Sequence, residues 1–188
     1  LEETNLLDDT IVIFTSDHGD MFGDHGMMLK GAMHYDGCTR IPLLVKRPGH
    51  AGGICESLVG SIDLAATILS LAGVEPYHGM QSHDLTPLLD NPSETLRETI
   101  LIEEDQVHDM VHTGRSLRMR TLITDTARLT IYDGLKHGEL FNRAEDPAEM
   151  HNLFGLPEAV RLQTDLMERL AREMMSLGDN SPRPTAFA

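Results

Sequence analysis

Apolar residues are grouped differently in the two halves of the chain. In the first half, residues 11–14 form an unbroken apolar run, and residues 41–45 form a second run with Pro42 near its start. Runs without polar alternation are typical of strands buried on both faces, as in parallel sheets that helices cover. Between residues 56 and 73, apolar residues recur every three or four positions and predict a helix packed on such a sheet.

The second half carries shorter patterns. Strand candidates occur at 99–102, 117–124, 129–132 and 139–141, and turn-like clusters separate them. These strands predict a small antiparallel sheet. Leu or Met recurs at every fourth position from 162 to 174, after Pro157, and predicts a helix that covers one face of this sheet.

The expected fold class is α/β. Residues 1–94 should supply part of a mixed, mostly parallel sheet flanked by helices. Residues 95–180 should form the small antiparallel sheet with its C-terminal helix, and residues 181–188 a loose tail. A parallel sheet needs several strands joined by long crossovers, and the first half has too few apolar runs for them. We therefore expect the chain to be the carboxyl-terminal part of a larger protein.

The chain is acidic, with 30 Asp and Glu, 15 Lys and Arg, and a formal net charge of −15 over 188 residues. This balance argues against a nucleic-acid partner, and no apolar run is long enough to span a membrane. The two cysteines, Cys38 and Cys55, allow one disulfide but do not imply it. An anionic substrate would need a locally reversed field, from a divalent cation and from Lys30.

Candidate chemistry follows the first predicted strand, at Asp17, His18 and Gly19. Parallel sheets place their sites just beyond the carboxyl ends of their strands. Adjacent side chains on a strand point to opposite faces, so Asp17 and His18 could meet one ion only if the backbone leaves the strand, and Gly19 permits such a turn. The simpler alternative is a strand end followed by a polar loop.

The residues that follow favour the first interpretation. Gly23-Asp24-His25-Gly26, Lys30, Tyr35-Asp36 and the segment 40–45 stand in an order that resembles the sulfatase family of the alkaline phosphatase superfamily. In that family, an Asp-His or Asp-Asn pair ends a central strand and a lysine follows about a dozen residues later. The segments 138–142 and 145–149 resemble the carboxyl-terminal signature of the same family. The resemblance thus runs over nearly the whole chain.

The resemblance implies roles for three residues, and two histidines are further candidates. Asp17 and His18 are implied as metal ligands, for calcium by resemblance, although an imidazole also suits manganese or zinc. Lys30 is implied to bind the sulfate group and to assist the leaving oxygen; otherwise it is a solvated loop lysine. It is the only Lys or Arg between residues 1 and 39. His25 is a candidate for the catalytic pocket, and His34 is a weaker one; each could instead form hydrogen bonds within a polar loop.

The chain also departs from the family. It has no Cys/Ser-x-Pro-x-Arg motif, whose first residue becomes the formylglycine nucleophile. The Asp pair that supplies the family's other two metal carboxylates, close to the amino terminus of its members, is also missing. The resemblance therefore implies the carboxyl-terminal portion of a sulfuric ester hydrolase that acts on a small anionic sulfate ester and is inactive alone. The missing amino-terminal half of the catalytic domain would be its partner. Two alternatives remain: a phosphodiesterase or phosphonate monoester hydrolase, and a non-catalytic metal-binding or interaction module.

Overall fold

The computed structural model describes residues 1–107, 109 and 114–178. The chain forms two compact units, and the described residues of the first are Leu1–Asp17 and Ile41–Arg97. The second contains His18–Arg40 and Glu98–Gly178. Residues 18–40 therefore belong to the unit of the carboxyl-terminal sheet, although the strands that flank them in the sequence belong to the other unit. The expected division after residue 94 stays a prediction, and the expected tail at 181–188 lies outside the described residues.

The first unit begins with the short helix η1 (Leu7–Asp9) and contains a two-stranded antiparallel ribbon. Strand β1 (Val12–Thr15) pairs with β2 (Leu43–Lys46), and Phe14 lies opposite Leu44. The side chains of Phe14 and Leu44 are 61% and 59% exposed, so the expectation of strands buried on both faces is not met. Phe14 and Leu44 are paired across the ribbon and therefore share one face, which is left largely uncovered within this unit. The mostly parallel sheet stays a prediction.

Helix α2 (Asp63–Leu71) lies within the segment 56–73, as its apolar stripe predicted. It starts at Asp63, whose fully buried carboxylate accepts hydrogen bonds from the backbone N–H groups of Gly60 and His83 at 2.8 and 3.0 Å. The Arg97 guanidinium donates to the same carboxylate at 2.6 Å. These bonds stabilise the turn before the helix and join α2 to the segment that leads into α3 (Thr86–Asp90).

The second unit confirms the predicted antiparallel sheet. Its strands are β3 (Ile100–Asp105), β4 (Arg118–Ile123), β5 (Ala127–Tyr132) and β6 (Gly138–Asn142), paired in the order β3-β4-β5-β6. Each strand is antiparallel to the next in the sequence. The sheet is therefore a meander, which short turns between consecutive strands can build.

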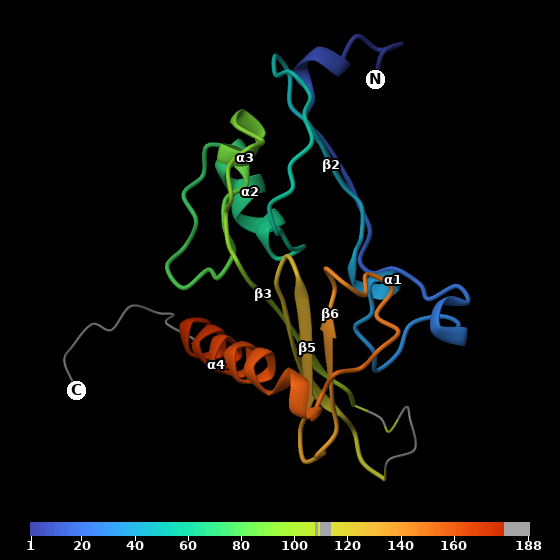
Figure 1. Ribbon diagram of the computed structural model, residues 1–188. Coiled ribbons are helices and arrows are strands. Elements are labelled where there is room, and N and C mark those ends of the chain that lie inside the picture. The colour runs from blue at the N-terminus through green and yellow to red at the C-terminus, as the bar shows by residue number, and fades with distance from the viewer. Residues whose placement is uncertain (108, 110–113, 179–188) are drawn as a thin grey trace, which may run out of the picture. The chain divides into compact units, whose positions relative to one another are not determined.

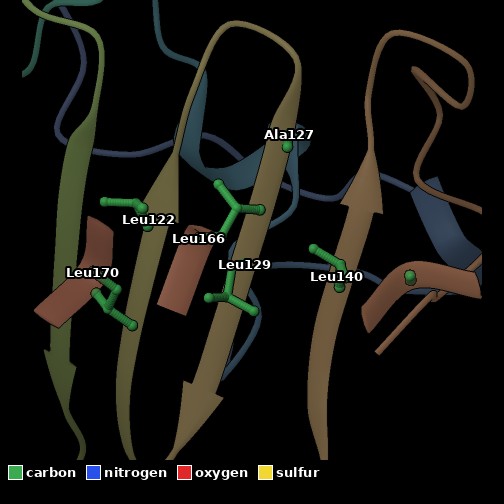
Figure 2. Close-up of a cluster of buried hydrophobic side chains, with 7 residues drawn as sticks. Leu122, Ala127, Leu129, Leu140, Leu166 and Leu170 are labelled. Atoms are coloured by element: carbon green, nitrogen blue, oxygen red, sulfur yellow. The ribbon is translucent and has the colours of Figure 1, made fainter. Parts of the chain in front are cut away.

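The predicted carboxyl-terminal helix covers one face of this sheet (Figure 1). After η3 (Pro157–Ala159), helix α4 (Val160–Ser176) places the buried side chains of Leu166 and Leu170 against the strands. Figure 2 shows them with the sheet residues that complete this core, namely Leu122, Ala127, Leu129 and Leu140. Burying these aliphatic side chains contributes on the order of 2 kcal/mol each, so this core is the main stabilising feature of the unit.

The other face of the sheet is covered by the segment 18–40, which contains η2 (Asp24–Gly26) and α1 (Asp36–Thr39). Ala32 packs with Leu117, Met119 and Tyr132 of the sheet. This face also buries polar side chains, because Thr121, Arg128 and Thr130 are all fully buried. Among the described residues, no helix combines the length and apolar character that a membrane crossing requires.

Candidate functional site

His18 and Lys30 are twelve positions apart in the sequence, yet their side chains meet. The distance from Lys30 Nζ to His18 Nε2 is 2.6 Å, and His18 Nδ1 lies 2.7 Å from the carbonyl oxygen of Gly19. The carbonyl can only accept, so Nδ1 carries the proton, and the lone pair on Nε2 accepts from the Lys30 ammonium. Both side chains are exposed. The pair therefore presents a fixed positive charge and an oriented imidazole on the surface of the second unit.

A tightly bonded loop brings Lys30 back to His18. The backbone N–H of Met21 donates to the carbonyl of Leu29 at 2.8 Å. The Asp20 carboxylate accepts from the N–H groups of Phe22 and Leu29, at 2.8 and 3.1 Å. Phe22, His25 and Leu29 have φ values of 46, 49 and 67°, a region that costs non-glycine residues energy and persists where the surrounding structure enforces it. The loop conformation is thus set by its own hydrogen bonds.

Gly19 is required for a close approach of two backbone segments. Its N–H donates to the carbonyl oxygen of Cys38 at 2.8 Å, and a Cβ atom at this position would overlap the carbonyl oxygen of Gly37. Its φ lies outside the left-handed region that favours glycine. Glycine is therefore required here because only a residue without a side chain fits against the backbone of Gly37, and not because the backbone makes the sharp turn that the sequence suggested.

We expect Gly19→Ala to destabilise the protein by about 1–3 kcal/mol, because the added methyl group overpacks a backbone contact. The measurement is the free energy of unfolding in urea. Gly31→Ala is the matched control, since a Cβ at Gly31 meets no atom within 4 Å and its φ is not left-handed. Equal stability of the two variants would contradict the requirement for glycine at the backbone contact of position 19.

Asp17 is the last residue of the first unit's opening segment, and its side chain is exposed. Its Oδ1 accepts a hydrogen bond from Ser16 Oγ at 3.3 Å. A carboxylate oxygen followed by an imidazole nitrogen is a donor set that divalent cations accept. In the part of the chain that the structure describes, no three His, Cys, Asp or Glu side chains gather as a ligand group. The roles of Asp17 and His18 as metal ligands therefore stay a prediction, one that the chemistry of the two donors suits.

The Lys30 ammonium also bears on metal binding. It is a cation placed at His18 Nε2, so it stands in for a metal ion on that nitrogen. A lone pair cannot accept a proton and bind a metal at once, so metal binding through Nε2 requires Lys30 to move away. The flexible lysine stem allows such a movement.

His25 and His34 lie in different surroundings. The His25 ring is half-buried and stacks on Tyr35, with ring centroids 3.8 Å apart. His34 is buried, and its nitrogens bond the Thr121 hydroxyl at 2.7 Å and the Glu104 carboxylate at 2.9 Å. Burial lowers the pKa of His34 despite the adjacent Glu104. The hydrogen bonds of His34 therefore reach the sheet and do not stay within its own loop.

Arg128 was not singled out by the sequence, although it is the largest fully buried side chain. Its Nε donates to Glu149 at 2.8 Å and its Nη1 to Glu139 at 2.7 Å. Burial alone would lower the pKa of Arg128, but the Glu149 and Glu139 carboxylates raise it overall. Its guanidinium carbon lies 4.7 Å from the centre of the Tyr35 ring. Tyr35 of the segment 18–40 therefore packs against a buried cation.

A second arginine attaches the same segment to the sheet unit. Arg143 Nη2 donates to both carboxylate oxygens of Asp36, at 2.8 and 2.6 Å. Asp36 is thus held by a side chain from far along the chain, rather than by its own backbone. The two cysteines, Cys38 and Cys55, are free thiols.

Comparison with known proteins gives a consistent result. The family model for the carboxyl-terminal part of N-sulphoglucosamine sulphohydrolase matches residues 23–176. An N-acetylglucosamine-6-O-sulfatase of Bacteroides thetaiotaomicron is 32% identical over 187 residues, which cover 97% of this chain and 33% of that protein. The chain therefore spans about a third of the length of this relative.

Two solved structures resemble the chain closely. One was determined in complex with its substrate D-glucosamine-2-N,6-O-disulfate; it matches with a TM-score of 0.84 and 29% identity, over 99% of this chain and 38% of the other. The phosphonate monoester hydrolase of Agrobacterium radiobacter matches with a TM-score of 0.87 and 25% identity, over 100% of this chain and 39% of the other.

Proposed function

Because this chain belongs to the sulfatase family, matching its carboxyl-terminal portion, we propose that it forms part of a metal-dependent sulfuric ester hydrolase. Its substrate would be a small anionic sulfate ester. The observation that carries the proposal is that the loop returns Lys30 to His18, with Nζ and Nε2 2.6 Å apart before a metal takes the Nε2 lone pair. A positive charge beside an oriented imidazole is suited to an anionic group whose ester oxygen gains charge in the transition state.

Each candidate residue has a role in this proposal. Asp17 and His18 hold the divalent cation: calcium first, with manganese or zinc as alternatives. When bound, the cation offsets negative charge on the ester oxygens. Lys30 binds the anion and stabilises the leaving oxygen as a compact point charge. His25 lines the pocket beside the loop, with its ring orientation set by Tyr35.

We assign the nucleophile to a part of the enzyme outside these 188 residues, because they contain no Cys/Ser-x-Pro-x-Arg motif. The 188 residues alone should then be inactive. The exposed apolar face of β1 and β2, which carries Phe14 and Leu44, is consistent with further strands and helices that cover it. These would belong to the rest of the catalytic domain, in a mostly parallel sheet.

The experiment is a comparison of substrates with the naturally expressed protein that contains this chain. We expect kcat/KM for an aryl sulfate to exceed kcat/KM for an aryl phosphodiester and for a phosphonate monoester by at least tenfold. The reverse order would replace the proposal by the alternative hydrolase, which the match to the phosphonate monoester hydrolase favours. No turnover of any of the three esters would favour a non-catalytic module.

A further inference from the structure

A continuous chain of hydrogen bonds crosses the face of the sheet that the segment 18–40 covers. Arg128 Nη1 lies 2.9 Å from Thr130 Oγ1, and Thr130 Oγ1 lies 2.7 Å from Thr121 Oγ1. Thr121 Oγ1 in turn lies 2.7 Å from His34 Nδ1, and His34 Nε2 lies 2.9 Å from Glu104 Oε2. Register explains the arrangement, because Thr121 and Thr130 are directly paired across β4 and β5.

The chemistry at the two ends gives every bond in this chain one direction. An ionised carboxylate can only accept, so His34 Nε2 donates to Glu104. Burial lowers the pKa of His34 and favours the neutral ring, whose Nδ1 then accepts from the Thr121 hydroxyl. Because Thr121 has no second proton to donate, it accepts from the Thr130 hydroxyl, whose oxygen accepts from Arg128. The chain therefore fixes His34 in the tautomer that carries its proton on Nε2.

The same face of the sheet holds the residues around His34. Ala32 packs into a buried apolar cluster with Leu117, Met119 and Tyr132. Tyr35 lies against Arg128, and Asp36 is bonded twice by Arg143. Lys30 is two residues before Ala32, the first of these attachments. The backbone that carries Lys30 is thus fixed to the sheet immediately after it.

We propose that Arg128 and His34 are positioning residues: through Thr130 and Thr121, the directed hydrogen-bond chain holds the segment 32–36 on the sheet and so places Lys30 against His18. The catalytic consequence rests on the proposed function, whereas the structural consequence does not. If the hydrogen-bond chain had a purely stabilising role, interrupting it would lower the free energy of unfolding and leave the geometry of the Lys30–His18 pair in the folded state unchanged.

The test variant is Thr130→Val, which replaces the hydroxyl by a methyl group of similar shape and interrupts the chain. Thr130→Ser keeps a hydroxyl and serves as the rescue. Thr164→Val is the matched control, because Thr164 bonds only within helix α4, to the carbonyl of Val160. Arg128→Lys is a second interruption, since one ammonium cannot reproduce the fork that reaches Glu139, Glu149 and Thr130.

The first measurement is long-range ¹H–¹⁵N spectroscopy of the imidazoles in the 188-residue chain. In the wild type, His34 should show a single tautomer with the proton on Nε2. In Thr130→Val, the ring nitrogens of both His34 and His18 should shift, and so should the amide of Lys30. Thr130→Ser and Thr164→Val should match the wild type. A mixture of tautomers in the wild type, or unchanged His18 and Lys30 signals in folded Thr130→Val, would overturn the proposal.

The second measurement is turnover of an aryl sulfate by the naturally expressed protein. Thr130→Val should lower kcat by about 10- to 100-fold, because small misplacements of a catalytic group are costly, with KM changed less than kcat. Thr130→Ser should restore at least half of the lost activity. If the wild type shows no turnover, the proposed function fails. The positioning role is still decided by the tautomer of His34 and by the changes in the NMR signals of His18 and Lys30.

Discussion

Replacing Asp17 by Asn and His18 by Ala together is expected to abolish the proposed binding of a divalent cation and to lower turnover by about a thousandfold. A loss of this size is expected because a metal ion supplies several kcal/mol of charge stabilisation in ester hydrolysis. Each 1.4 kcal/mol or so is a factor of ten in rate. Asn keeps the shape of Asp but loses its charge, and Ala removes the only nitrogen donor of the pair.

The measurement is metal content per protein by mass spectrometry, together with kcat for an aryl sulfate, in the naturally expressed protein. The control is Asp9→Asn with His78→Ala, which removes the same groups from two exposed positions outside the candidate site. Metal content and kcat should match the wild type in the control. Retained metal and unchanged kcat in the Asp17 and His18 variant would eliminate the assignment of these ligands.

The fold could be predicted where the strands or helices that cover an apolar face lie in the same unit as that face. The four-residue repeat that includes Leu166 and Leu170 predicted a helix on the small sheet, and both side chains are buried there. Phe14 carries an equally strong apolar signal but is exposed. An apolar run indicates that a strand prefers burial, whereas it carries no information about which strands or helices provide the cover.

The candidate site shows a similar division. The interval from His18 to Lys30 matched a family pattern, and the two side chains are in contact. The support beneath them was missed, because Arg128 and Thr130 alternate with apolar residues on β5 and such alternation usually indicates a solvent-exposed face. That face is covered by a segment about 90 residues earlier in the chain. Local patterns do not report such a contact.

We expect Lys30→Ala to lower kcat by about 100- to 1,000-fold for sulfate esters of alkyl alcohols, which are poor leaving groups. Removing one preorganised charge from a developing oxyanion has an effect of this order. For esters of acidic phenols the loss should be about tenfold or less, because the leaving oxygen then carries its charge without help. A plot of log kcat against the pKa of the leaving group should therefore be steeper in the variant than in the wild type.

This dependence on the leaving group separates two roles of the same ammonium. In the proposed function Lys30 also binds the substrate anion, so its removal would take away that contact as well. Loss of binding alone would raise KM to the same extent for every ester and leave the slope unchanged. Lys136→Ala is the control, since Lys136 is an exposed lysine outside the segment 18–40. An unchanged slope in Lys30→Ala would restrict Lys30 to substrate binding, and a steeper one would assign it to the departing oxygen.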